Sequence, residues 1–290
     1  MTDVLNGAYD IHVHAAPDVM PRAGDLVTVF REASDAGMAG ILFKDHCFPT
    51  HAAAYALNHS HSTDTRAFGA LALNVTVGGI NPLAVEGALK AGVDLVYFPT
   101  YSSAPHLEKI GRTHLPMPLP KGDFPGIGIR GSNGAIIPEL DDVLSLIKEY
   151  DAAIGTGHLS PEETLLLVEA AARRGVSRVM VTHASEIVPG MTVDEQRRAV
   201  EMGALIEHCF LAATDAVPGS IPIAEIVRQT HEIGAEHVIL ASDYGKASLG
   251  SPVRGFRKAL EDAVAEGLSE AELDLVVRRN PRRLLVDGRR

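Results

Sequence analysis

The stretch YDIHVHAAPD, residues 9–18, places three polar side chains in an otherwise apolar segment. Asp10, His12 and His14 alternate with Ile11 and Val13. Side chains on a strand alternate between its two faces, so a strand here would direct all three polar side chains to one side. Two imidazoles two residues apart can bind one cation, at about 2.0–2.1 Å per Zn–N bond. The pair by itself is a weak signal, and its partners elsewhere in the chain decide the prediction.

Further residues with metal-binding or acid–base chemistry follow apolar, β-branched runs. They lie at or near the carboxyl ends of four segments: Lys44 and His46 in GILFKDH, His158 in AIGTGH, His183 in RVMVTH and Asp243 in HVILASDY. Chance placement is a poor account of so many such residues at equivalent positions. The set therefore predicts a metal site, with Lys44 as the one member that does not bind metal in its ordinary form.

The runs that carry these residues alternate with helical patterns, which is typical of repeated βα units. Most of them are spaced by about 30 residues, the size of one βα unit. The sequence therefore predicts a single (β/α)8 TIM barrel domain over residues 1–290, whose reactive groups lie at the carboxyl ends of the strands. The eight strands are expected to end near His14, His46, Asn74, Thr100, His158, His183, Cys209 and Tyr244.

The spacing between the fourth and fifth predicted strands and the residues that begin three predicted helices add detail to this prediction. The distance from Thr100 to His158 is nearly double the usual spacing, so the loop after strand four carries an insertion at about residues 101–137. Within it, GIGIRGSNGAIIP at 126–138 predicts a β-hairpin with its turn at 131–134. Ser or Thr followed three residues later by Glu predicts capping boxes that begin at Ser160, Thr192 and Ser269.

The whole set of motifs resembles the amidohydrolase superfamily of metal-dependent TIM-barrel hydrolases. The shared pattern is D-x-H-x-H, then a lysine, then single histidines at strand ends five and six and an aspartate at strand end eight. Asn280-Pro281 followed by RRLL resembles the segment that often closes such chains. The resemblance extends from residue 10 to about residue 285, and these motifs do not assign the chain to a substrate.

The resemblance implies a metal-ligand set. His12, His14 and Asp243 would bind a buried metal, and His158 and His183 would bind a second, more exposed one. The cofactor is then one or two divalent ions, with zinc expected first and Mn, Ni or Fe as alternatives. In the common pattern a carbamylated lysine on strand four bridges the ions, but here that strand ends FPTYSS and offers no lysine.

Lys44 on strand two is expected to take the place of that lysine. Leu42, Lys44 and His46 are two residues apart along the strand and so lie on the same face. Both Lys44 and His46 should therefore face the barrel interior. Desolvation and like charge oppose a buried ammonium beside cations, whereas N6-carboxylation would turn the side chain into an anion with two oxygen donors. The alternative is an amine that pairs with Asp10 or Asp243 in a one-metal site.

The implied reaction is hydrolysis of an amide, lactone or ester bond of a small molecule by a metal-activated hydroxide. Asp243 would accept the proton from the water and pass it to the leaving group. His46 would contact the substrate or the water, with a role as a further ligand as its alternative. A one-metal decarboxylase or deaminase, a phosphoesterase or nuclease, and a barrel that binds without turnover are the rival interpretations.

Four residues in the predicted loops are candidates for substrate binding, namely Arg22, Tyr101, Arg130 and Lys246. The positive charges of Arg22, Arg130 and Lys246 are consistent with an anionic substrate. A salt bridge to Asp18 or Asp25 is the competing interpretation for Arg22, and a solvated side chain is that for Arg130. His106 and His114 lie in the insertion, where an exposed loop is expected and closure over the site is the alternative.

The amino-acid composition disfavours several other classes of function. The chain has 26 basic and 37 acidic residues and a net charge of −11, which disfavours binding to nucleic acid or anionic membranes. Only Cys47 and Cys209 occur, and we interpret both as reduced, non-ligating thiols. No signal peptide is evident, and no apolar run approaches the ~20 residues of a membrane helix. We expect a cytoplasmic homo-oligomer whose partner is a small-molecule substrate.

Overall fold

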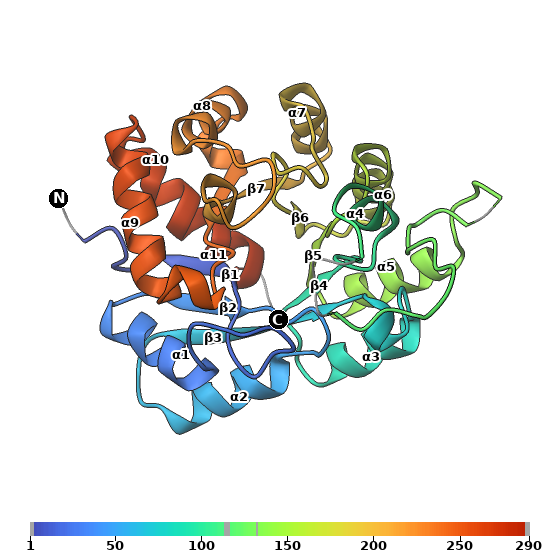
Figure 1. Cartoon of the computed structure of the whole chain (residues 1–290), viewed down its shortest axis with the longest axis horizontal. Coiled ribbons are helices and arrows are strands. Elements are labelled where there is room, and N and C mark those ends of the chain that lie inside the picture. Colours follow the sequence, from blue (N-terminus) through green and yellow to red (C-terminus); the bar gives the residue numbers. More distant parts are fainter. Residues whose placement is uncertain (1–2, 113–116, 132, 288–290) are drawn as a thin grey trace.

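Eight parallel strands form the centre of the molecule, in sheet order β1 to β8. The computed structural model describes residues 3–112, 117–131 and 133–287, and its helices surround the strands (Figure 1). A parallel bridge from Val13 to Tyr244 joins the first strand to the chain just beyond the last, which confirms the predicted (β/α)8 barrel. The strands are β1 Tyr9–Val13, β2 Gly40–Phe43, β3 Arg66–Ala72, β4 Leu95–Tyr97, β5 Ala153–Gly155, β6 Val179–Val181, β7 Leu205–Cys209 and β8 Val238–Ala241.

The helices of the outer layer connect successive strands and close the chain. None in the described part of the chain is long and apolar enough to cross a membrane. They are α1 Leu26–Asp35, α2 His51–Ser60, α3 Pro82–Lys90, α4 Ala104–Lys109, α5 Glu139–Glu149, α6 Pro161–Arg173, α7 Val193–Glu201, α8 Ile223–Ile233, α9 Pro252–Ala265, α10 Glu270–Asp274 and α11 Asn280–Leu285.

The Asn-Pro segment has a structural role at the start of α11. Asn280 Nδ2 donates hydrogen bonds to the carbonyl oxygens of Ala235, at 2.8 Å, and Val238, at 2.7 Å. These acceptors lie where the chain enters β8, and Pro281 follows in the first turn of α11. The segment therefore anchors the last helix to the amino end of β8.

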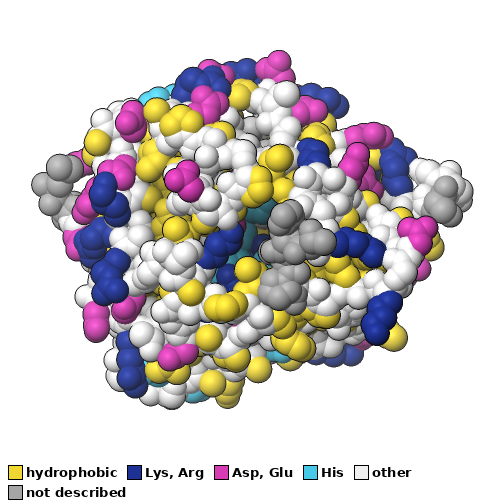
Figure 2. Space-filling model, viewed as in Figure 1, with side chains coloured by type: hydrophobic (Ala, Val, Ile, Leu, Met, Phe, Trp, Pro, Cys, Tyr) yellow, Lys and Arg dark blue, Asp and Glu magenta, His cyan; other side chains and the backbone are white. Residues whose placement is uncertain are grey.

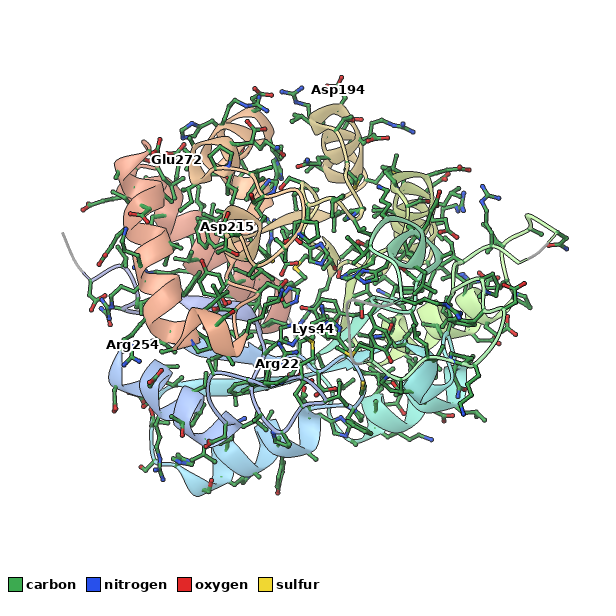
Figure 3. The ribbon with its side chains drawn as sticks, in the orientation of Figure 1. Arg22, Lys44, Asp194, Asp215, Arg254 and Glu272 are labelled. Carbon is green, nitrogen blue, oxygen red and sulfur yellow. The ribbon has the colours of Figure 1, made fainter. Side chains whose placement is uncertain are left out.

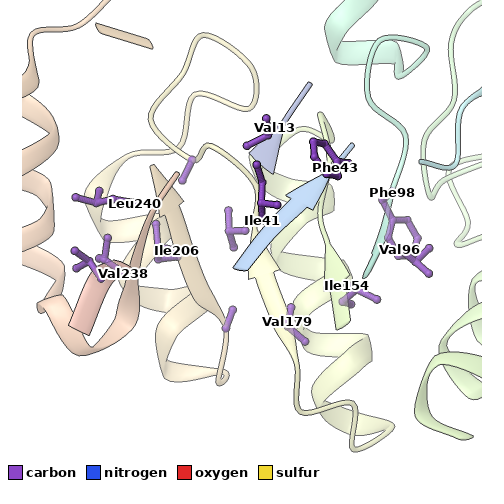
Figure 4. Close-up of a cluster of buried hydrophobic side chains, with 14 of the residues drawn as sticks. Val13, Ile41, Phe43, Val96, Phe98, Ile154, Val179, Ile206, Val238 and Leu240 are labelled. Carbon is purple, nitrogen blue, oxygen red and sulfur yellow. The ribbon is translucent and has the colours of Figure 1, made fainter. Parts of the chain in front are cut away.

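Alternate residues of the strands fill two apolar layers. Residues such as Ile41, Val96 and Leu240 pack between the strands and the helices (Figure 4). Their neighbours, among them Leu42 and Ile239, fill the barrel interior. Burial of each such side chain stabilises the fold by about 1.5–3 kcal/mol relative to exposure. The interior layer closes the amino end of the barrel, which leaves the carboxyl end for polar groups.

Two of the three predicted capping boxes are present, at Thr192–Glu195 and Ser269–Glu272. At α6 the prediction was half wrong. Ser160 accepts a hydrogen bond from Glu163 N, but the Glu163 carboxylate does not return it. Glu163 Oε1 instead accepts from the backbone N–H groups of residues 129, at 2.8 Å, and 130, at 3.2 Å.

The insertion between β4 and β5 contains α4, whose first turn is capped by Ser103. The predicted hairpin is reduced to one antiparallel bridge between Arg130 and Ile136, and no strand forms in the described part of this segment. Two backbone hydrogen bonds flank the bridge, from Gly131 N to Ala135 O at 2.8 Å and from Ile137 N to Ile129 O at 3.0 Å. The backbone donors of 129 and 130 are used by Glu163 on α6, which explains why the ladder extends no further. Ser132, in the predicted turn, lies outside the described residues.

Candidate metal and active site

Polar side chains converge on a cavity of about 530 Å³ at the carboxyl ends of the strands. Figure 2 shows imidazoles in a central hollow beside Lys and Arg side chains. The polar and charged residues that line the cavity are His14, Arg22, Lys44, His46, His106, His158, His183, Glu186, Asp215, Asp243 and Lys246. Strand ends two, five, six and eight all contribute, as the sequence predicted.

The strands end one to three residues before these side chains, and the turns aim them. By parity with Ile154 and Val181, which face the helices, His158 and His183 should point outward. His183 has φ 28°, and Gly157, directly before His158, has φ 65°. Asp243 also adopts the left-handed region, with φ 53°, at a cost of order 1–3 kcal/mol for such a residue. These turns bring both imidazoles back over the barrel mouth.

Two glycines allow the backbone to approach closely here. A Cβ on Gly157 would lie 2.3 Å from Phe98 O, and one on Gly245 would lie 2.1 Å from His14 O. Neither distance is compatible with a side chain. The absence of a Cβ at these two positions therefore permits the tight packing of the loops that carry His158, Asp243 and His14.

The alternation predicted for β1 is interrupted. The register with β2 shifts between Asp10 and Val13, and Ile11 packs in the barrel interior. Asp10 Oδ1 accepts from Ser242 N at 3.0 Å, and burial raises the pKa of Asp10 to about 7. Asp10 thus supports the loop after β8, while only His12 and His14 reach the site.

His12, His14 and Asp243 form the first of two ligand sets. Asp243 Oδ1 lies 3.2 Å from His12 Nε2 and 3.0 Å from His14 Nε2. His12 Nδ1 lies 3.1 Å from Glu207 Oε1, so Nδ1–H donates to this carboxylate and leaves a lone pair on Nε2. A carboxylate behind a ligating imidazole is the usual support of a metal-bound histidine.

His14 carries its proton on the opposite nitrogen. Arg22 Nη2 donates to His14 Nδ1 at 3.2 Å, so the neutral ring has its proton on Nε2 and donates to Asp243. Burial and the Arg22 charge lower the pKa of His14 to about 3. To bind a metal through Nε2, His14 must move this proton to Nδ1, which requires Arg22 to release it.

Lys44 lies against the first set. Its Nζ is 2.9 Å from His12 Nε2 and 4.6 Å from the centre of the Tyr97 ring. Burial lowers the pKa of the Lys44 amine, which favours its uncharged form. No ion pair of Lys44 with a carboxylate is found across the described residues, so direct pairing with Asp10 or Asp243, the alternative considered above, is not observed.

His158 and His183 form the second set. Their Nε2 atoms are 3.0 Å apart. Burial lowers the pKa of His183 to about 4 and that of His158 well below its usual value, so both rings are uncharged at neutral pH. Uncharged imidazoles with converging ring nitrogens are the form in which histidine binds a metal.

Glu186 belongs to the second set and was missed by the sequence analysis. Its Oε2 lies 3.9 Å from His183 Nδ1, and its Oε1 is buried without a hydrogen-bond partner in the described structure. Burial, with Asp243 and Glu207 nearby, raises the pKa of Glu186 well above its usual value. Ligand atoms of His183, Glu186 and Asp243 lie within 4.8 Å of one another. The spacing H-A-S-E was the available signal.

His106 was predicted to lie in an exposed loop, and this is wrong. It is only 8% exposed, and its Nδ1 lies 2.8 Å from His158 Nδ1. The rings stack with their centres 4.9 Å apart. The cause is α4, whose Ser103 cap turns the insertion back over the cavity. His114 lies outside the described residues.

Glu207 and His208 are neighbours on β7 and face opposite ways, and Glu207 is the one that faces the site. Besides His12, its carboxylate binds the backbone of the second set, since Oε2 accepts from His183 N at 3.0 Å. His208 faces the helices and contacts Ser185 Oγ at 3.0 Å. Burial lowers the pKa of His208 to about 4.

Arg22 and Lys246 reach the cavity, whereas Tyr101 and Arg130 do not. Arg22 also pairs with Asp18 at 2.6 Å, so the salt-bridge interpretation is confirmed and substrate binding by Arg22 stays a prediction. Tyr101 is buried behind His46, its ring centre 5.8 Å away. Arg130 pairs with Glu162 at the surface, held there by the turn of the insertion. Substrate contacts from Tyr101 and Arg130 therefore find no support.

The mouth of the cavity combines one cation with an apolar wall. Lys246 is half-buried, donates to the carbonyl of Ala216, and has no carboxylate partner among the residues that the structure describes. Lys44 and Arg22 lie near the middle of the molecule, and Arg254 lies at its periphery (Figure 3). The apolar wall consists of Met20, Ile110, Ile187, Val188, Leu211, Ala216, Val217 and Pro218.

The two cysteines are not part of either set of converging imidazoles. Cys47 Sγ lies 3.9 Å from the Tyr101 hydroxyl, behind the site. Cys209 Sγ is 3.6 Å from His12 Nδ1, the nitrogen already committed to Glu207. Burial raises the pKa of both thiols, so both remain protonated at neutral pH.

The buried histidines and carboxylates could hold a metal ion. His183 Nδ1 and Glu186 Oε1 are buried polar atoms without partners among the described residues, and such atoms normally find one. The donor set of imidazole nitrogens and carboxylate oxygens suits zinc and other first-row divalent ions. The residues present therefore fit a divalent metal ion of this kind.

Comparisons with known proteins agree with this class. The barrel resembles an amidohydrolase from Pseudomonas aeruginosa (TM-score 0.67, 11% identity, 98% of this chain and 97% of that chain). It also resembles an organophosphorus hydrolase from Deinococcus radiodurans (TM-score 0.61, 14% identity, 98% and 94%). A 2,6-dihydroxybenzoate decarboxylase is similar as well (TM-score 0.56, 11% identity, 96% and 99%). The chain thus shares its barrel fold with these three proteins.

The family of the chain follows from its sequence. Residues 7–207 match the model of a family described as "Family of unknown function (DUF6282)", and the chain belongs to this family. No curated protein matches it.

Proposed function

We propose that the protein is a metal-dependent hydrolase that cleaves an amide, lactone or ester bond of a small molecule. One observation carries the proposal: two sets of ligand atoms face the same cavity. One is centred on Asp243 Oδ1 with His12 and His14, and the other is the His158–His183 pair with Glu186 beside it.

In this proposal His12, His14 and Asp243 would hold one divalent ion, and His158, His183 and Glu186 would hold another. Lys44, which lies beside the first set, would supply oxygen donors if it were N6-carboxylated. Its uncharged amine is the form that reacts with carbon dioxide, and burial favours that form. Bound zinc, or Mn, Ni or Fe in its place, would act as a Lewis acid and lower the pKa of a coordinated water.

The remaining steps fall to side chains of this chain. Asp243 borders the cavity and faces both sets, so it accepts the proton of the attacking water and returns it to the leaving group. His106 and Glu207 position His158 and His12 through their ring nitrogens.

The cavity favours a substrate with an apolar body and one anionic group. The apolar wall at the mouth accommodates the body, and Lys246, without a carboxylate partner in the described structure, attracts the anion. A lactonase used as a template for engineered organophosphate hydrolysis has a similar fold (TM-score 0.62, 12% identity, 98% and 97%). Lactones that carry a carboxylate are therefore the first substrates to test.

The first experiment is elemental analysis of protein expressed with and without added bicarbonate, zinc or manganese. Two metals per chain, rising with bicarbonate, support the two-set site and the modified Lys44. One metal per chain, indifferent to bicarbonate, contradicts the Lys44 bridge and favours the one-metal decarboxylase or deaminase. No bound metal contradicts the proposal as a whole.

Activity is then measured on a panel of lactones, amides and esters, each with and without a carboxylate. The loaded protein is compared with its Asp243→Asn variant and with Asp142→Asn, a surface control on α5. Hydrolysis that disappears only in Asp243→Asn supports the assigned reaction, and equal hydrolysis by all three proteins contradicts it.

A further inference from the structure

His46 lies in the cavity, and three buried neighbours define its hydrogen bonding. Its Nδ1 lies 2.9 Å from Thr100 Oγ1. Its Nε2 makes no hydrogen bond to any residue that the structure describes. Thr100, Asn74 and Ser102 behind it are all 0% exposed, so water does not decide their proton positions.

The orientation of the Asn74 amide is fixed by the backbone. Its Oδ1 faces Thr100 N at 2.9 Å, Ser102 N at 3.3 Å and Ser102 Oγ at 2.8 Å. A backbone N–H can only donate, so this atom is the amide oxygen. The other atom, Nδ2, donates to the carbonyl of His46 at 2.9 Å and to Thr100 Oγ1 at 2.7 Å.

This amide determines where the Thr100 hydroxyl proton points. Thr100 Oγ1 already accepts from Asn74 Nδ2, and the one other partner that the described residues give it is His46 Nδ1. A buried hydroxyl whose proton finds no acceptor is costly. The hydroxyl therefore donates to His46 Nδ1, which must then be unprotonated.

We propose that Asn74 is a positioning residue that, through Thr100, fixes His46 as a neutral imidazole with its proton on Nε2. The ring then presents an N–H donor to the cavity. Such a donor binds a carbonyl, phosphoryl or leaving-group oxygen of the substrate, and it cannot ligate a metal through Nε2. This assignment rests on the proposed function for the identity of the substrate oxygen, but the tautomer stands without it.

The ring is held for this task on two sides. It stacks on His14 with ring centres 4.8 Å apart, and Tyr101 meets it edge-on from behind. Asn74 also binds the backbone carbonyl of His46. The Asn74 amide thus determines both the position of the His46 ring and the location of its proton. This amide lies outside the cavity and bears no charge.

The test is ¹⁵N NMR of histidine-labelled full-length protein, because the shifts of the two ring nitrogens report which one carries the proton. The His46 signals are identified by their loss in His46→Gln. We expect a protonated Nε2 and a hydrogen-bonded, unprotonated Nδ1 in the wild type. A proton on Nδ1 overturns the proposal. The readout needs neither metal nor substrate, so failure of the proposed hydrolase activity leaves it intact and distinguishable.

Matched variants of Thr100 provide a second measurement. Thr100→Ser keeps the hydroxyl, and its His46 signals should match those of the wild type. Thr100→Val removes the hydroxyl, so the Nδ1 signal should shift toward that of an acceptor without a hydrogen bond. Identical His46 signals in Thr100→Val and Thr100→Ser overturn the relay. If Thr100→Val does not fold, the wild-type tautomer alone decides.

Discussion

At the residue scale, the direction of the His12 lone pair depends on Glu207. The carboxylate accepts the Nδ1 proton at 3.1 Å and leaves Nε2 free for a cation. Loss of such a supporting carboxylate typically costs about 10–100-fold in metal affinity. We expect Glu207→Gln to weaken metal binding by that factor, measured by competition with a chelating dye. Glu232→Gln, on the surface of α8, is the control. An affinity within twofold of the wild type would contradict this role.

Arg22 should oppose metal binding at His14. It places a positive charge beside the first set and holds His14 in the tautomer whose Nε2 carries the proton. Arg22→Met removes both effects, so the metal should bind more tightly, by up to about tenfold or ~1.4 kcal/mol. Arg254→Met, 79% exposed at its side chain, is the matched control. Weaker binding in Arg22→Met, measured in the same dye assay, would refute this account.

The sequence predicted the residue types of the site better than their contacts. His12, His14, Lys44, His46, His158, His183 and Asp243 follow apolar runs, and all but the buried His12 line the cavity. Glu186 lies in the irregular loop after β6 and His106 in the short helix α4, and neither segment is long enough for a period of two or 3.6 to indicate the direction of a side chain. They could not be assigned because only the path of the folded loops brings them to the site.

At the element scale, the turn after β5 determines where His158 points. Gly157 has φ 65°, and a Cβ there would lie 2.3 Å from Phe98 O. Gly203, after α7, has φ 96° and open space around a Cβ. Alanine costs about 1–2 kcal/mol for the left-handed backbone at either site, and the clash at 157 adds roughly 1–3 kcal/mol.

We therefore expect Gly157→Ala to reduce the free energy of unfolding by roughly 2–5 kcal/mol and Gly203→Ala by only about 1–2 kcal/mol. Urea denaturation of both variants measures the difference. Equal losses would mean that the backbone at 157 relaxes and that close approach is not required there.

Barrel elements were predictable because the period of two and the helix caps repeat along the chain. Strand ends were placed up to three residues too late, because polar residues such as Asp243 continue the pattern after the ladder has ended. The hairpin predicted at 126–138 is limited to one bridge and two cross-strand backbone hydrogen bonds for a tertiary reason. Glu163, on another element, uses its backbone donors, and local sequence does not reveal such competition.

At the scale of the whole molecule, the buried imidazoles make stability depend on pH. His208 has a folded-state pKa of about 4 against 6.5 for the unfolded chain. The unfolded state therefore takes up a proton between these values that the folded state does not. For the metal-free protein, the free energy of unfolding should fall as pH drops from about 6.5 to 4, by up to ~1.4 kcal/mol per pH unit for this group.

His14, His106 and His183 act in the same direction, since burial lowers each pKa. Urea denaturation at a series of pH values measures the total, and His208→Gln should make the decline shallower. His237→Gln, at an exposed position beside Glu236, should leave it unchanged. A decline of equal slope in wild type and His208→Gln would show that His208 is charged or solvated in the folded state.

Glu207 has a consequence for the way the two sets fill. One of its oxygens holds the ring of His12, and the other holds the backbone of His183. A cation at either set tightens the same carboxylate and so prepares the other set. We therefore expect cooperative metal binding. In a zinc titration followed by native mass spectrometry, the population of chains with two metals should rise as that of empty chains falls, and chains with one metal should stay scarce.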